Sequence, residues 1–185
     1  DDTGLSAFSA GLSGAELDGF VALNGVDRRH VLLASEGNAL QLRGGHQDDV
    51  ILLDAGRGTL AGGEGADRFV FRDLLRGSVV VEDFSVTGQD IIDLSSLGAS
   101  SGYLHQYLRI TNAAGTYTLQ LDLDGNGAGF TNLAVSLPGL SAADADLYRL
   151  VAAGRLDVGE LALQTRVSIV ASVAGASENG PTPGQ

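Results

Sequence analysis

The sequence predicts an all-β protein: a short parallel β-roll, capped by an antiparallel hairpin or sheet and one short helix. Two observations lead to this prediction. A nine-residue pattern of glycines, an aspartate and an apolar residue recurs between residues 44 and 70, and apolar residues alternate with polar ones over residues 117–123 and 133–137. A fixed period indicates a repeat architecture, whereas alternation with a period of two indicates half-buried strands.

The composition favours a folded, acidic protein that binds cations. The chain has 185 residues and a net charge of −12, and all 11 of its basic residues are arginine. Such an acidic surface argues against nucleic acid as a partner, because phosphates need basic side chains. Cysteine is absent, which excludes disulfides and thiolate metal sites, and no apolar run is long enough to predict a membrane span. Of the 23 acidic residues 17 are aspartate, the acid that turns and oxygen-ligand loops prefer.

The repeat consists of three consecutive nine-residue units, "GGHQDDVIL" (44–52), "LDAGRGTLA" (53–61) and "GGEGADRFV" (62–70). We interpret each unit as a half-turn: a tight loop, whose glycines allow positive φ angles, followed by a short strand that points its central side chain inward. Two half-turns place the loops 44–49 and 62–67 next to each other. Loop carbonyls together with Asp49 and Asp67 would then form an all-oxygen cage, which suits a hard cation such as Ca²⁺.

This segment resembles the RTX nonapeptide, G-G-x-G-x-D-x-U-x, which builds the calcium-bound parallel β-roll of proteins exported by type I secretion. In that family, carbonyls at the first and third places of one loop bind calcium with those at the second and fourth places of the loop 18 residues later. The resemblance implies the metal ligands Gly44, His46, Asp49, Gly63, Gly65 and Asp67. Gln47 replaces a glycine and Gly58 stands where the middle unit should carry an aspartate. We therefore expect one or two calcium sites on this edge and an empty opposite edge.

The resemblance continues after the repeat. The stretch 81–98 is similar to the segment that follows the roll in such proteins, which implies that Asp83 and Asp90 cap the last edge as further ligands. Residues 104–158 resemble the target domain that closes many large type I secreted adhesins and enzymes, and 167–185 resemble the opening strand of a Calx-β domain. The expected division is an N-terminal lead-in (1–23), a degenerate β-roll (24–80), an antiparallel capping or target region (81–158) and a linker or next domain (159–185).

The loop between the two alternating segments is a second candidate cation site. "DLDGNG" places Asp122, Asp124 and Asn126 at positions 1, 3 and 5 of an EF-hand-like loop. Position 12 is Leu133 rather than glutamate, so the strongest bidentate ligand is missing. A plain turn rich in Asp, Asn and Gly is the alternative interpretation of this loop.

The stretch "SAADADLYRLVAAG" (141–154) predicts the short amphipathic helix. Ser141 would be its N-cap and Asp144 would complete a capping box, while Gly154 would end it. Leu147 and Leu150 would face the core, together with Val151.

We find no catalytic constellation and predict that the chain is not an enzyme. Its histidines, His30, His46 and His105, fit no metal-binding spacing, and no nucleophile elbow or phosphate-binding loop occurs. The resemblance implies a calcium-binding, calcium-stabilised module of a large secreted or cell-surface bacterial protein, an adhesin or an exoenzyme, that folds after export. Its partners would be calcium ions, neighbouring domains of the same chain and the type I export machinery.

The alternative is a polysaccharide-binding accessory module of an extracellular carbohydrate-active enzyme. This alternative predicts exposed aromatic or basic side chains along one face. The chain offers only four tyrosines, with no tryptophan and no lysine.

Overall fold

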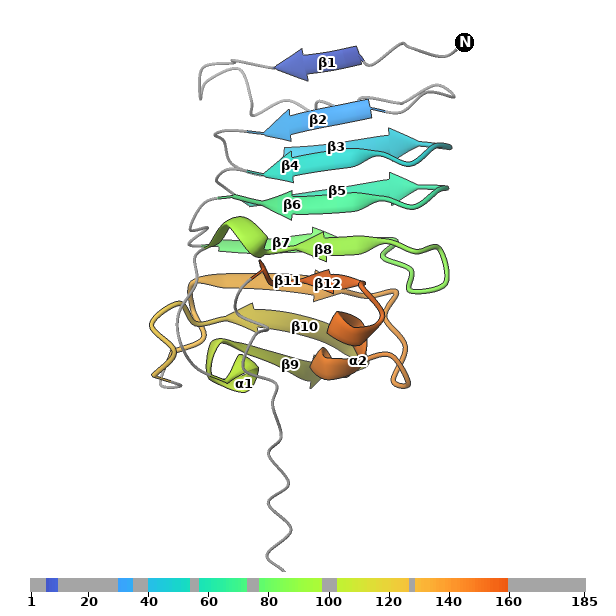
Figure 1. The fold of residues 1–185 in the computed structure, drawn as a ribbon. Helices are drawn as coiled ribbons and strands as arrows, with labels where there is room; N and C mark the ends of the chain where they lie inside the picture. Colours follow the sequence, from blue (N-terminus) through green and yellow to red (C-terminus); the bar gives the residue numbers. More distant parts are fainter. Residues whose placement is uncertain are drawn as a thin grey trace, which may run out of the picture.

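The computed structural model describes residues 6–9, 30–34, 40–53, 57–72, 77–97, 103–126 and 129–159. These residues form two six-stranded sheets, one 3₁₀ helix and two short α-helices (Figure 1). The fold is thus mostly strands, as the sequence predicted. Within the described ranges, none of the helices has the length and apolar character needed to cross a bilayer.

The first sheet contains parallel strands only. In spatial order it runs β1 (Ser6–Ser9), β2 (His30–Ala34), β4 (Val50–Leu53), β6 (Arg68–Phe71), β8 (Ile91–Asp93) and β12 (Leu156–Asp157). Its first strand, β1, comes from the predicted lead-in. Figure 1 shows these strands stacked one below another along the long axis of the molecule.

The second sheet is parallel in its first half and antiparallel in its second. In spatial order it runs β3 (Leu40–Gly45), β5 (Gly58–Gly63), β7 (Gly77–Val81), β11 (Leu133–Leu137), β10 (Thr116–Leu121) and β9 (Leu108–Ala113). From β2 to β8 the chain alternates between the two sheets, which is the winding of a β-roll.

The nine-residue period sets the register between β3 and β5 and between β4 and β6. Ile51 on β4 lies beside Phe69 on β6, and Leu42 on β3 lies beside Leu60 on β5, in each case 18 residues apart. These inward side chains are almost completely buried. The predicted stacking of the apolar eighth-place residues is confirmed for Ile51, Leu60 and Phe69.

The antiparallel part caps the roll by extending its second sheet. The predicted hairpin of β10 and β11 is present, with Leu119 beside Val135. Strand β11 also pairs in parallel with β7, where Val135 lies beside Val79. A single hydrophobic cluster continues from the roll into this capping region, so both parts share one core.

The helix near the C-terminus begins later than the sequence predicted. Helix α2 (Leu147–Ala152) is capped by Asp146, whose side chain accepts a hydrogen bond from the Arg149 N–H at 2.9 Å. Ser141 and Asp144 bond to each other and close a separate turn. The assignment of Ser141 as N-cap was therefore wrong, because the extended backbone of Asp146 interrupts the helical path. Gly154 follows the helix with a φ of +69°, as expected for its end.

The two remaining helical elements are short connections. The 3₁₀ helix η1 (Ser95–Leu97) follows β8, and α1 (Leu104–Tyr107) precedes β9. Several predictions lie outside the described residues: the Calx-β resemblance of 167–185, most of the lead-in, and residues 54–56 of the edge expected to be empty.

Candidate metal site

The two loops that the repeat predicts as a cation site lie side by side at one edge of the roll, where β3 leads to β4 and β5 leads to β6 (Figure 1). Their backbones are joined directly. The Glu64 N–H donates to the Gly45 carbonyl at 2.9 Å, and the Ala66 N–H donates to Asp48 Oδ1 at 2.9 Å. The 18-residue spacing thus brings the loops 44–49 and 62–67 into contact.

Three buried aspartates stack along this edge, one from each successive turn of the roll. Asp67 Oδ1 accepts a hydrogen bond from the Asp49 N–H at 2.8 Å, and Asp90 Oδ1 accepts one from the Asp67 N–H at 3.0 Å. All three residues are at most 3% exposed. The carboxylates of Asp67 and Asp90 therefore each hold the backbone of the preceding turn, and the edge gathers acidic side chains away from water.

Asp67 is the electrostatic centre of this stack. Burial raises its pKa to about 7, and the neighbouring carboxylates of Asp90, Asp49 and Asp83 push it the same way, against the opposing effect of the hydrogen bond from Asp49. The pKa of Asp90 is also raised, chiefly by burial. Asp67 Oδ2 is buried and has no hydrogen-bond partner among the described residues. A buried carboxylate oxygen without a partner is costly, and a bound cation would supply the missing interaction.

The paired glycines leave room for these carboxylates. At Gly62, a Cβ atom would collide with Asp67 Oδ2; at Gly44, it would collide with both Asp49 Oδ2 and the Gly62 carbonyl oxygen. Two oxygens from different loops thus converge beside the Gly44 Cα. The donor set suits a hard cation such as Ca²⁺. The Gly62 carbonyl is absent from the predicted ligands, although the repeated Gly-Gly was a visible signal of close approach.

Three of the four other predicted loop ligands lie around an open hollow of about 320 Å³ next to the buried aspartates, and the fourth, Gly65, lies against the backbone of Gln47 and Asp48. Gly44, His46 and Gly63 line it, and Asp83 closes one side. The His46 imidazole is exposed, with Nδ1 3.3 Å from Glu64 Oε2. If His46 binds the metal, it would therefore do so through its backbone carbonyl oxygen, as the resemblance implies.

The two loops are not equivalent in backbone conformation. Gly63 and Gly65 have φ angles of +104° and +118°. Gln47, which holds the place of Gly65 one turn earlier, is not among the described non-glycine residues with a positive φ. A side chain with a Cβ disfavours the left-handed region, so the two loops differ in backbone conformation where Gln47 takes the place of a glycine.

Asp83 and Asp90 both use their carboxylates to hold backbone N–H groups. Asp83 accepts from Gly62 at 3.0 Å and from Gly63 at 2.9 Å. Asp90 accepts from Asp67 through Oδ1 and from Ser85, at 2.8 Å, through Oδ2. These bonds tie the segment after β7 to the loop 62–67. Metal ligation by Asp83 and Asp90 stays a prediction.

The EF-hand-like loop has the contacts of a turn. Both carboxylate oxygens of Asp124 accept from Asn126, at 3.0 Å from its backbone N–H and 2.7 Å from its side-chain amide. Asp122 is buried at the end of β10, 2% exposed. The described residues contain no group of three or more His, Cys, Asp or Glu side chains that could hold a metal ion. The candidate site between the loops would combine carbonyls with two carboxylates, and metal binding at the EF-hand-like loop stays a prediction.

No protein-family model matches the chain, and no curated protein matches it. Among solved structures, the chain is similar to the AlgE6R3 subunit of the mannuronan C5-epimerase from Azotobacter vinelandii, determined in solution. The two are 26% identical in sequence, the match covers 89% of this chain and 91% of that one, and the TM-score is 0.48.

Proposed function

We propose that this chain is a calcium-binding module whose folded state is stabilised by calcium held between the loops 44–49 and 62–67. The observation that carries the proposal is the buried Oδ2 oxygen of Asp67, which has no hydrogen-bond partner among the described residues. Asp49 and the Gly62 carbonyl lie at the same edge. Oxygen donors of this kind favour Ca²⁺, which accepts irregular geometry, over Mg²⁺, which demands a tight octahedron and keeps its waters.

The proposed setting is outside the cell, in a large bacterial protein exported by type I secretion. Extracellular modules bind calcium with Kd values of roughly 10⁻⁴ to 10⁻³ M. At a few mM calcium, each ion then adds about 1 to 2 kcal/mol to the free energy of unfolding by mass action. In the calcium-poor cytosol the carboxylates of the aspartate stack repel one another, which would keep the roll loose until export.

Calcium titration with a matched pair of variants tests the proposal. Isothermal titration should show calcium binding to the wild-type module, and thermal melts followed by circular dichroism should show a higher Tm in a few mM calcium than in EGTA. Asp67→Asn should lose both effects. Asp144→Asn, which alters an exposed turn far from the loops in sequence, should keep both. An identical wild-type Tm in the two buffers would contradict the proposal.

A second candidate function, binding of an extracellular polysaccharide, is favoured by one surface feature. Tyr103 and Tyr148 are the large hydrophobic residues with high exposure in the described ranges, at 56% and 47%. The His105 ring stacks on Tyr103 at 5.7 Å between centroids, and its Nδ1 lies 3.4 Å from the Tyr148 hydroxyl. Aromatic faces with polar tips suit ligands that are apolar on one side and hydroxylated on the other.

Affinity electrophoresis in gels that contain a neutral or an acidic polysaccharide tests this second candidate. Retardation of the wild-type module, reduced in both Tyr103→Ala and Tyr148→Ala, would support it. Tyr117→Phe, a change on the hairpin of β10 and β11, serves as the control. Migration unaffected by either polysaccharide would leave calcium binding as the proposed function.

A further inference from the structure

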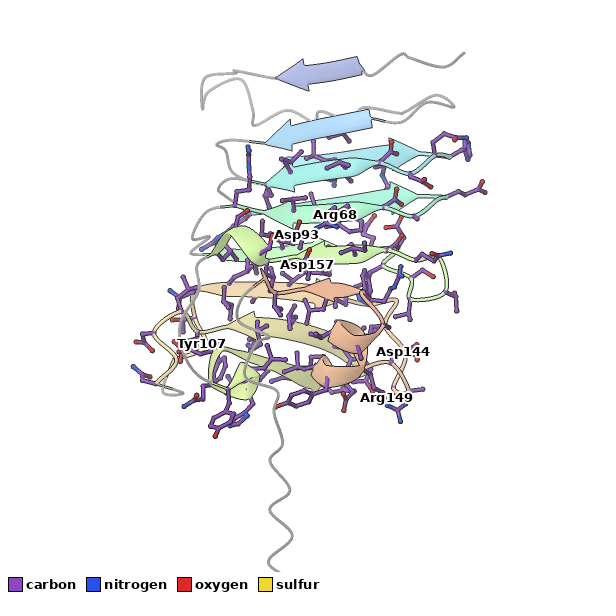
Figure 2. The ribbon with its side chains drawn as sticks, in the orientation of Figure 1. Arg68, Asp93, Tyr107, Asp144, Arg149 and Asp157 are labelled. Atoms are coloured by element: carbon purple, nitrogen blue, oxygen red, sulfur yellow. The ribbon has the colours of Figure 1, made fainter. Side chains whose placement is uncertain are left out.

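Arg68, the first residue of β6, follows the candidate ligand Asp67 directly and reaches toward the C-terminal end of the module. Its Nε donates to Asp93 Oδ2 at 2.8 Å, and its Nη2 donates to Asp157 Oδ2 at 2.6 Å. Figure 2 shows the three labelled side chains grouped on the strands β6, β8 and β12. One guanidinium therefore spans three adjacent strands of the first sheet.

The two carboxylates of this cluster are held on their other sides as well. Asp93 Oδ1 accepts from the backbone N–H and the hydroxyl of Ser95, at 2.9 and 2.6 Å. Asp157 Oδ1 accepts from the Gly159 N–H at 3.2 Å. Burial opposes ionisation of Asp93, yet its hydrogen bonds from Ser95 and Arg68 hold its pKa below the ordinary value. The cluster is thus a formed ion-pair network and not a chance surface contact.

Strand β12 is short, and the residues that flank it help to hold it: the Arg155 N–H donates to the Leu150 carbonyl at 2.8 Å, and Val158 is buried in the core. The strand contains two residues, and its edge of the sheet is bonded by the Ile92 N–H to the Arg155 carbonyl at 2.9 Å and by the Leu94 N–H to the Asp157 carbonyl at 2.7 Å. A strand this short relies on side-chain contacts to stay paired. Leu156 supplies one from the core side, and the Arg68–Asp157 ion pair supplies one from the opposite face.

The position of Arg68 is itself set by the candidate calcium loops. The Arg68 N–H donates to the Asp49 carbonyl at 2.8 Å, and the Ile91 N–H donates to the Asp67 carbonyl at 2.8 Å. Ordering of the loop 62–67 thus orders the start of β6 and the guanidinium that it carries. Without a cation, repulsion within the aspartate stack opposes this order.

We infer that calcium binding at the loop 62–67 docks strand β12 onto the roll through Arg68 and its ion pairs with Asp93 and Asp157. The inference rests on the proposed calcium site and adds a second place in the module that responds to the ion. Because coupling between two sites is reciprocal, docking of β12 must in turn strengthen calcium binding by the same factor.

Hydrogen exchange of the full 185-residue chain, followed by NMR with and without calcium, tests the coupling. Calcium should slow exchange at the Ile92 and Leu94 amides, which bond to β12, as well as at the Asp49 and Asp67 amides in the loops. Asp157→Asn keeps the loops and Arg68 but removes one charge of the network. It should reduce the calcium-dependent protection at Ile92 and Leu94 by about fivefold, the upper range for a partly exposed ion pair.

The same variant should weaken calcium binding in isothermal titration by a similar factor, while the loop amides of Asp49 and Asp67 stay protected at saturating calcium. Arg68→Gln, which removes the other partner of the ion pair, should also reduce the protection at Ile92 and Leu94 and weaken calcium binding. Arg109→Gln is the matched control: this exposed arginine contacts Gln120 on β10 and the ring of Phe130, which precedes β11, and its loss should change neither quantity.

Three results would overturn the inference, and they separate it from the proposed function. Calcium may bind the wild type without changing exchange at Ile92 and Leu94, or Asp157→Asn may leave both the protection and the affinity unchanged. Either result removes the coupling and leaves the calcium site in place. A wild-type chain that does not bind calcium at all would remove the proposed function together with the inference.

Discussion

Replacement of Asp67 by asparagine should change the stability of the module in opposite directions with and without calcium. The substitution keeps an oxygen that can accept the Asp49 N–H and removes a charge from a position that is 1% exposed. A purely structural aspartate would lose stability in both buffers. A calcium ligand held among other carboxylates should gain stability in EGTA and lose the stabilisation that calcium provides.

The size of the effect follows from the pKa of Asp67. A rise from the ordinary value of 3.8 to about 7 corresponds to about 4 kcal/mol of unfavourable free energy for the ionised carboxylate in the folded state. Part of this is offset in the variant, because the asparagine amide must find a hydrogen-bond acceptor beside Gly62. We therefore expect Asp67→Asn to stabilise the calcium-free module at pH 8 by about 1 to 3 kcal/mol. For a chain of this size that is a rise in Tm of roughly 2 to 12 °C.

Thermal melts of the wild type, Asp67→Asn and Asp144→Asn at pH 8, each in EGTA and in a few mM calcium, measure both halves of the prediction. The wild type should gain about 1 to 2 kcal/mol or more per ion from calcium, and Asp67→Asn should gain almost nothing. Equal destabilisation of Asp67→Asn in both buffers would refute the reasoning. So would a variant that binds calcium with wild-type affinity in isothermal titration.

Three further predictions concern pH, the identity of the metal and the glycine at position 62. Because the pKa of Asp67 is raised, the calcium-free folded state binds more protons than the unfolded state between about pH 4 and 7. In EGTA melts, the wild type should therefore lose stability relative to Asp67→Asn as the pH rises through this range. The calcium affinity of the wild type should fall below pH 7, where protons compete for the Asp67 carboxylate. Calcium binding should survive a large excess of Mg²⁺ in isothermal titration, whereas equal competition would argue against the oxygen cage. Gly62→Ala should weaken calcium binding and lower the Tm in calcium by several degrees, because the added methyl displaces Asp67 Oδ2; Gly115→Ala, at a turn where a Cβ meets no neighbouring atom, should leave calcium binding unchanged.

The amino-acid sequence by itself determined the winding of the roll. Its nine-residue period sets glycines and aspartates into the loops and places Ile51, Leu60 and Phe69 at inward positions, and these are properties of short segments. The structure confirms the register of 18 residues between β3 and β5 and between β4 and β6, and it confirms the contact between the loops 44–49 and 62–67. The hairpin of β10 and β11 was predictable for the same reason, since two alternating strands joined by one loop pair locally.

The tertiary structure decided which distant segments complete the sheets and the site. Strand β11 pairs with β7 although the chain builds β8, η1, α1, β9 and β10 between them, and periodicity carries no information about such a pairing. For the same reason the sequence did not reveal that Asp83 holds the backbone of loop 62–67 or that Arg68 joins Asp93 and Asp157. Local pattern fixes φ angles and the inward or outward face of a residue. The partner of a charged side chain depends on which strands pack together, and in this chain that choice is made by burial of one shared core.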